Sequence, residues 1–83
     1  MTDAELTRLI AHELQKVAPE ADPASLSPDQ PIREAVDIDS FDFLRVLIAL
    51  SEATGVEIPE ADYGKLTTLK EMVHYFRAHL TVR

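Results

Sequence analysis

Two apolar stripes on one predicted helix constrain this chain more than any other feature of its sequence. The first stripe has the i, i+3, i+4, i+7 and i+11 spacing of a helix that faces a core, and it consists of Phe43, Val46, Leu47, Leu50 and Thr54. The second lies about 140° around the same helix, and it consists of Phe41, Leu44 and Ile48. A small domain can bury only one of these faces in its core. We therefore expect the second stripe to meet a partner, a cargo or another part of the chain.

The start of this helix places a hydroxyl group among carboxylates. Asp39 is suited to the N-cap position, because its side-chain oxygen can accept hydrogen bonds from the free amides of the first turn. Asp42, three residues on, complements the positive end of the helix dipole. Ser40 therefore lies at the helix N-terminus, where an anion such as a phosphodiester is also well tolerated. Taken alone, Ser40 is more simply explained as a structural serine, since serine favours this position anyway.

Two further amphipathic helices are predicted, over residues 3 to 18 and residues 69 to 80. Both show apolar residues at helical spacing. Each is preceded by a capping box, in which an N-cap threonine and a glutamate three residues later exchange hydrogen bonds with each other's backbone amides. The two pairs are Thr2 with Glu5 and Thr68 with Glu71.

A long connection precedes the central helix. Residues 19 to 37 contain four prolines, and apolar anchors follow in the same segment: Pro19, Pro23, Pro28 and Pro31, then Leu26, Ile32 and Val36. Loops of this length are unusual in small domains and are normally functional or well anchored. Residues 32 to 36 can form a short turn of helix. A loop of this length lets the helices on either side of it run in the same general direction, because a short link would force them antiparallel.

The pattern after the central helix completes the predicted fold. Gly55 is expected to end that helix in the left-handed conformation. Residues 60 to 65 can form only a short helix, which Gly64 weakens. The prediction is an all-α bundle of four helices, three main and one short, with a long first loop. A chain of this length forms one domain, residues 1–83.

The acidic residues of the chain are concentrated around the central helix. The net charge is −7, and the segment from Glu34 to Asp62 holds eight of the 15 acids with a single base, Arg45. Such a surface disfavours nucleic acid and anionic membranes. It suits a basic protein surface, although solubility alone explains many charge runs. Without cysteines, a signal peptide or a membrane-length apolar segment, the expectation is a cytoplasmic monomer.

The sequence favours no enzyme class. Histidines 12, 74 and 79 lack the spacing of metal ligands, and two glycines are too few for a phosphate-binding loop. A hydrolase that uses Ser40 as its nucleophile would need a general base, and no histidine lies near Ser40 in the sequence.

Three segments, taken together, resemble the acyl carrier protein family. Asp39-Ser40-Phe41 looks like the family's Asp-Ser-Leu attachment motif, and it opens an apolar helix after a proline-rich loop. Residues 55–59, Gly-Val-Glu-Ile-Pro, and residues 66–69, Leu-Thr-Thr-Leu, match the family's pattern after its second helix and at the start of its last. The resemblance covers nearly the whole chain and is weakest over residues 1 to 25.

The resemblance implies a four-helix acyl-carrier-like bundle that carries a prosthetic group. Ser40 would receive 4′-phosphopantetheine from coenzyme A through a separate, magnesium-dependent phosphopantetheinyl transferase, and Asp39 would assist the metal or the transferase. The thiol of the arm would carry acyl groups as thioesters. The residues expected to meet acyl-loading and acyl-transferring enzymes with basic docking surfaces are Phe41, Asp42, Leu44, Arg45, Ile48, Glu52, Glu60 and Asp62.

Three positions depart from the family's usual residues. Asp37 stands where the family usually has glycine, Phe41 replaces leucine, and Arg45 replaces an acid. These differences favour a free-standing carrier of specialised polyketide, aminoacyl or other acyl chemistry over a housekeeping carrier of fatty acid synthesis. The alternative is an interaction module that has the same fold and carries no prosthetic group.

Overall fold

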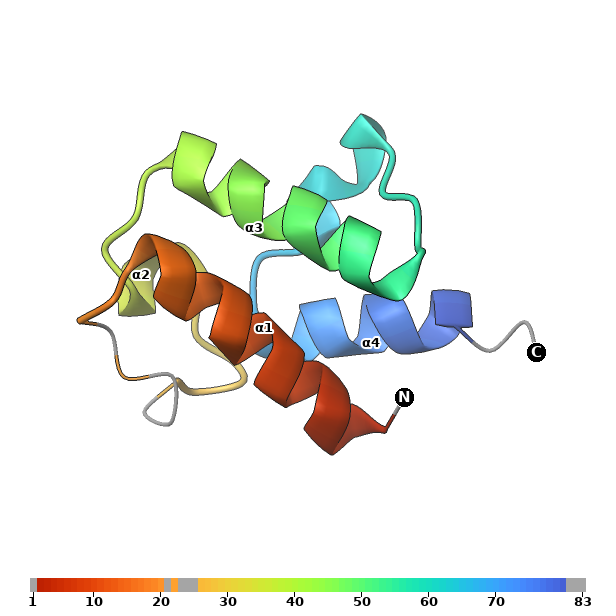
Figure 1. The fold of residues 1–83 in the computed structure, drawn as a ribbon, viewed down its shortest axis with the longest axis horizontal. Coiled ribbons are helices and arrows are strands. Elements are labelled where there is room, and N and C mark those ends of the chain that lie inside the picture. Colours follow the sequence, from red (N-terminus) through yellow and green to blue (C-terminus); the bar gives the residue numbers. More distant parts are fainter. Residues whose placement is uncertain (1, 21, 23–25, 81–83) are drawn as a thin grey trace.

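The computed structural model describes residues 2–20, 22 and 26–80, and it confirms the all-α prediction (Figure 1). Three long helices and two short ones make up the described chain: α1 (Asp3–Val17), α2 (Ile32–Ala35), α3 (Ser40–Thr54), the 3₁₀ helix η2 (Glu60–Lys65) and α4 (Leu69–Leu80). The described residues contain no strand, only an isolated bridge between Pro31 and Thr68. Pro23, one of the four loop prolines, lies outside the described residues.

The helix ends follow the capping signals. The Thr2 amide donates to Glu5 Oε1 at 2.8 Å, and the Glu5 amide donates to Thr2 Oγ1 at 3.2 Å. The same exchange joins Thr68 and Glu71 at 3.0 and 3.1 Å. Gly55 ends α3 with φ +76°, in the left-handed conformation as predicted. The helix predicted to end at residue 18 ends one residue earlier, with Ala18 as its C-cap.

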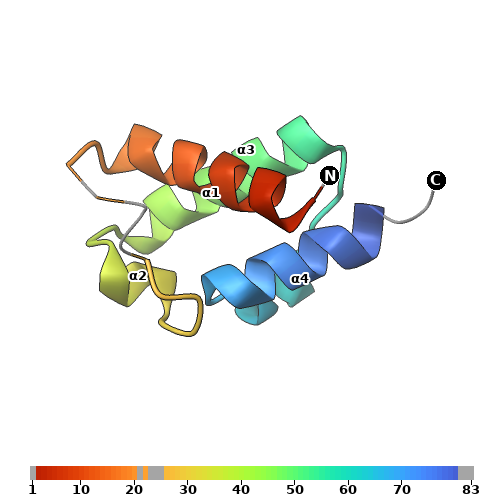
Figure 2. The same ribbon diagram turned by 90° about the horizontal axis from the view of Figure 1, so that it is seen from below.

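The parallel course that a loop of this length allows is not the course that the structure shows. Helix α1 runs antiparallel to α3 and α4, which run in the same direction as each other (Figures 1 and 2). The loop before α3 is long for another reason. It passes beside the start of α4, where the Ile32 amide donates to the Thr67 carbonyl at 2.9 Å and the Lys70 amide donates to the Pro28 carbonyl at 3.1 Å. Loop length alone does not set helix direction, because extra residues can form such a detour.

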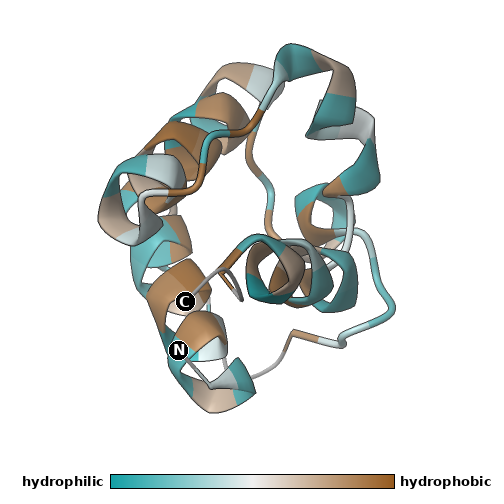
Figure 3. Cartoon of the chain, turned by 90° about the vertical axis from the view of Figure 1, so that its right-hand side faces the viewer, coloured by the Kyte–Doolittle hydropathy of each residue, from teal (hydrophilic) through white to brown (hydrophobic). Residues whose placement is uncertain are grey.

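The core lies between the three long helices and the two segments that join them. Apolar bands alternate with polar ones along the helices, as amphipathic packing requires (Figure 3). The largest of the fully buried side chains come from the three long helices and from both joining segments: Phe76, Leu6, Ile10, Leu14, Ile32, Leu47, Leu50, Leu66, Met72 and Val46. Burial of Ile32 fixes α2 against the bundle. No helix in the described part of the chain is long and apolar enough to cross a membrane.

Candidate functional site

Ser40 is the first residue of α3, and its side chain is exposed. Asp39 is the N-cap, with Oδ1 accepting from the Asp42 amide at 2.8 Å. The next amide, that of Phe43, donates to the Asp39 carbonyl at 3.0 Å. No residue in the described ranges forms a hydrogen bond with the Ser40 hydroxyl. The capping function is thus performed by Asp39, and the hydroxyl of Ser40 is left available for chemistry.

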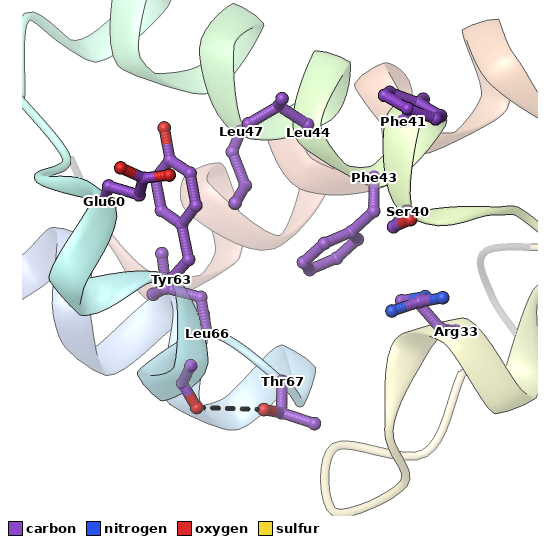
Figure 4. A pocket seen from close by; sticks show the side chains of 11 residues that line it. Arg33, Ser40, Phe41, Phe43, Leu44, Leu47, Glu60, Tyr63, Leu66 and Thr67 are labelled. Atoms are coloured by element: carbon purple, nitrogen blue, oxygen red, sulfur yellow. Dashed lines mark hydrogen bonds between the residues drawn. The ribbon is translucent and has the colours of Figure 1, made fainter.

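An open pocket of about 520 Å³ adjoins Ser40 (Figure 4). One wall is the inner edge of α3, with Phe43, Leu44 and Leu47 directed into the pocket. The opposite wall belongs to η2 and the segment after it, and includes Tyr63 and Leu66. The lining is mostly apolar, and it accepts a hydrocarbon or a pantetheine-like chain more readily than a charged one. The exposed hydroxyl therefore lies at the edge of a space suited to a flexible, weakly polar arm.

The two stripes of α3 occupy different environments. On the first stripe, Val46, Leu47 and Leu50 are buried in the core as predicted. The first stripe's Phe43 is only half-buried and lines the pocket instead. On the second stripe, Phe41 is 77% exposed and Ile48 is 49% exposed. Leu44 is half-buried because its side chain leans into the pocket. The outer face of α3 thus presents two large apolar side chains to solvent, which are the residues available to a partner.

The charged residues expected to meet partners do not all share one environment. Arg45, Glu52 and Glu60 are exposed, and Asp42 is half-buried at the start of α3. The side chain of Asp62 is only 22% exposed. Its Oδ2 accepts from the Tyr75 hydroxyl at 2.8 Å, and its Oδ1 lies 3.2 Å from Lys65 Nζ. This carboxylate therefore already has two partners within the chain, and it links η2 to α4.

The hydrogen bond between Asp62 and Tyr75 shifts the pKa of both groups. The Tyr75 hydroxyl, and then Lys65, lower the pKa of Asp62 below its usual range. Burial of Tyr75, and then its hydrogen bond to Asp62, raise the pKa of the tyrosine to about 12. The neutral tyrosine and the ionised aspartate are thus the states that the fold favours. Because η2 forms a wall of the pocket, this link also fixes that wall.

Substitution Tyr75→Phe should lower the melting temperature at neutral pH, because it leaves the Asp62 carboxylate without its tyrosine donor. The aspartate's pKa is depressed in the folded state, so its stabilisation is present above the unfolded pKa of about 3.9 and is lost as the pH falls through the folded value. The difference in melting temperature between the two proteins should therefore shrink in acid. Thermal melts across the acid range measure it, and a difference independent of pH would contradict the role of the carboxylate.

Sequence reasoning did not place Arg33 or Tyr63 at the pocket. Arg33 reaches the pocket from α2, and Tyr63 reaches it from η2. Tyr63 is half-buried there. Arg33 is an exposed base in a turn of four residues, and nothing in the spacing of the sequence indicates that the turn faces Ser40. The charge pattern is the one sequence feature that draws attention to Arg33, because this base directly precedes the acidic segment from Glu34 to Asp62.

Comparison with known proteins agrees with this geometry. The family model for the phosphopantetheine attachment site matches residues 4–76, and so covers α1 to most of α4. An acyl carrier protein of Lactobacillus johnsonii is 32% identical over 79 residues, which is 95% of this chain and 98% of that protein. The chain belongs to the acyl carrier protein family. Two other acyl carrier proteins are similar to it: that of Rubrobacter xylanophilus is 37% identical over 60 residues (72% of this chain, 74% of that protein), and that of Campylobacter hominis is 35% identical over 71 residues (86% and 85%).

Membership of the acyl carrier protein family establishes the cofactor and the kind of role. The prosthetic group of the family is 4′-phosphopantetheine, attached covalently. Acyl carrier proteins are carriers, on which phosphopantetheinyl transferases and acyl-handling enzymes act. The residues around α3 fit the group, because the exposed Ser40 hydroxyl, which has no hydrogen-bond partner among the described residues, borders a mostly apolar pocket.

Proposed function

We propose that the Ser40 hydroxyl carries the 4′-phosphopantetheine and that the chain delivers acyl thioesters to partner enzymes. The observation that supports this most directly is the free hydroxyl at the first residue of α3, beside the pocket. Ser51 is less suitable, because its hydroxyl donates to the Val56 carbonyl at 2.6 Å and helps to hold the end of α3.

In the attachment reaction, Ser40 Oγ forms a bond to the phosphorus that bears pantetheine. The bond from that phosphorus to the rest of coenzyme A breaks, and the hydroxyl proton passes to a base of the transferase. Asp39 holds the helix start rigid through one carboxylate oxygen. Its second oxygen has no hydrogen-bond partner in the described ranges, which leaves it free to bind the transferase's magnesium ion or a transferase residue. Once bound, the group supplies the thiol that this cysteine-free chain lacks.

The exposed face of α3 is the proposed docking surface for partner enzymes. Phe41 and Ile48 provide exposed apolar contacts. Glu60 lines the same pocket as Phe41, and Glu52 lines the same hollow as Ile48. Both acids are exposed, so an enzyme with a basic rim would be attracted. Asp62 is less suited to this role than its neighbours, because its carboxylate is engaged within the chain.

We infer that the acyl chemistry is specialised rather than that of housekeeping fatty acid synthesis. Phe41 and Arg45 support this inference, since both are exposed on α3 where partners would bind. The family usually has a smaller leucine at the first position and an acid at the second. Both differences would change contacts at the surface and not in the core.

Intact-mass measurement tests the attachment. The chain is incubated with coenzyme A, magnesium and a broad-specificity phosphopantetheinyl transferase. We expect the wild-type chain to gain the mass of one phosphopantetheine group and Ser40→Ala to gain none. Ser27→Ala is the matched control, because Ser27 is also exposed, and it should gain mass normally. Absence of a gain in the wild type would favour the unmodified interaction module, and a gain in Ser40→Ala would place the attachment elsewhere.

A further inference from the structure

Arg33 is a base at the mouth of the pocket. It is exposed on α2 and lines the same pocket as Ser40. Figure 4 shows the guanidinium group and Ser40 at the same end of the pocket, with Glu60 at the other end. Four other bases of the described chain lie within ion-pair distance of an acid: Lys16 with Glu13, Lys65 with Asp62, Lys70 with Asp29 and Arg77 with Asp3. In the described ranges no acid lies within that distance of Arg33.

The backbone that carries Arg33 is firmly held. Ile32, its neighbour, is fully buried, and the Ile32 amide donates to the Thr67 carbonyl at 2.9 Å. The turn itself is closed by the Val36 amide, which donates to the Ile32 carbonyl at 2.8 Å. The Cα atom of Arg33 is therefore fixed relative to the pocket, and only its side chain is free to adjust. A fixed base is a better anion ligand than a mobile one, because less freedom is lost on binding.

The charges near Ser40 make a base valuable there. Acids dominate the adjoining sequence, and four of them lie within six residues of Ser40: Glu34, Asp37, Asp39 and Asp42. A phosphodiester on Ser40 would add another negative charge. The amides of Asp42 and Phe43 already donate hydrogen bonds within the cap. The two amides before them, those of Ser40 and Phe41, lie at the positive end of the helix and favour an anion. Among the residues that line the pocket, Arg33 is the single base.

We propose that Arg33 binds the phosphodiester of the attached arm and holds the arm at the mouth of the pocket. This proposal rests on the proposed attachment at Ser40. Arginine suits the role because its planar guanidinium presents paired donors to phosphate oxygens, and lysine lacks that geometry. The arm then starts beside the apolar wall of α3 instead of pointing into solvent. Arg33 is a positioning residue, and it takes no part in the transfer of acyl groups.

Nuclear magnetic resonance of the loaded chain tests the proposal. The phosphorus resonance of the phosphodiester is recorded in the wild type, Arg33→Gln, Arg33→Lys and Arg8→Gln. We expect the resonance to shift in Arg33→Gln and to shift less in Arg33→Lys. The matched control Arg8→Gln removes the same charge from an exposed arginine of α1 that does not line the pocket, and it should leave the resonance unchanged. Raising the salt to about 1 M, where the Debye length is about 3 Å, should move the wild-type resonance towards that of Arg33→Gln.

A second measurement needs no substitution. In the wild type, exchange of the Arg33 Nε proton with water should slow severalfold when the chain is loaded, and that of Arg45 should not. Intact mass separates the possible failures. A wild-type chain that gains no mass contradicts the attachment at Ser40. If the chain gains mass, two results overturn the role of Arg33: a phosphorus resonance that does not shift in Arg33→Gln, or one that shifts equally in Arg8→Gln.

Discussion

Substitution Leu47→Ala should lower the free energy of unfolding by about 2–5 kcal/mol. Leu47 is 2% exposed and lies in the core beneath α3, so truncation removes buried apolar surface and leaves a cavity. A domain of this size has a total stability of about 4–12 kcal/mol, from roughly 0.05–0.15 kcal/mol per residue. The substitution therefore removes a large part of it. Urea denaturation followed by circular dichroism measures the loss, and the melting temperature should fall by at least about 8 °C.

The control for Leu47 lies on the same helix. Glu52 is exposed, and Glu52→Ala keeps a good helix former, so its stability should stay within about 0.5 kcal/mol of the wild type. If Leu47→Ala melted at the temperature of the wild type, Leu47 would not face the core. The assignment of the two stripes would then be reversed.

Substitution Phe41→Ala should weaken binding to the phosphopantetheinyl transferase about ten- to hundredfold without changing the fold. Burial of a phenylalanine side chain contributes about 1.5–3 kcal/mol, which corresponds to that change in Kd. Phe41 is 77% exposed in the free chain, so a partner that covers it gains most of this contribution. Isothermal titration calorimetry measures the loss of affinity. Unchanged affinity would remove Phe41 from the proposed docking surface, and a large fall in melting temperature would show a structural role instead.

The substitution Phe41→Leu separates specialised chemistry from fatty acid synthesis. Leucine is the residue that the family usually has after its serine, and it preserves an apolar contact at this position. If the chain serves specialised enzymes, Phe41→Leu should bind a ketosynthase of fatty acid synthesis more tightly than the wild type does. If both proteins bind that ketosynthase with equal affinity, Phe41 does not set the choice of pathway.

Local rules of the sequence were enough to place the helices. The capping boxes at Thr2 and Thr68 and the left-handed Gly55 lie where the pattern predicts them. These signals work because each depends on residues only a few positions apart, whose geometry the helix itself fixes. The same reasoning placed Ser40 at the N-terminus of α3, since the Asp39 cap is a local feature as well.

The features that sequence reasoning missed depend on contacts between distant segments. The antiparallel course of α1 follows from the detour of the loop past the start of α4. The engagement of Asp62 follows from a tyrosine 13 positions away. The place of Arg33 at the pocket follows from the attachment of α2 to the Thr67 carbonyl. Spacing along one helix carries no information about such pairings, which arise only when the elements pack together.

The attachment of Ile32 to Thr67 also has a consequence for the length of the chain between α2 and α3. One end of that stretch is pinned to the start of α4, and the other is pinned by the cap at Asp39. The number of residues between these two points therefore sets the distance from the Ser40 hydroxyl to the pocket. Swapping residues within the stretch can preserve that distance, but inserting or deleting one cannot.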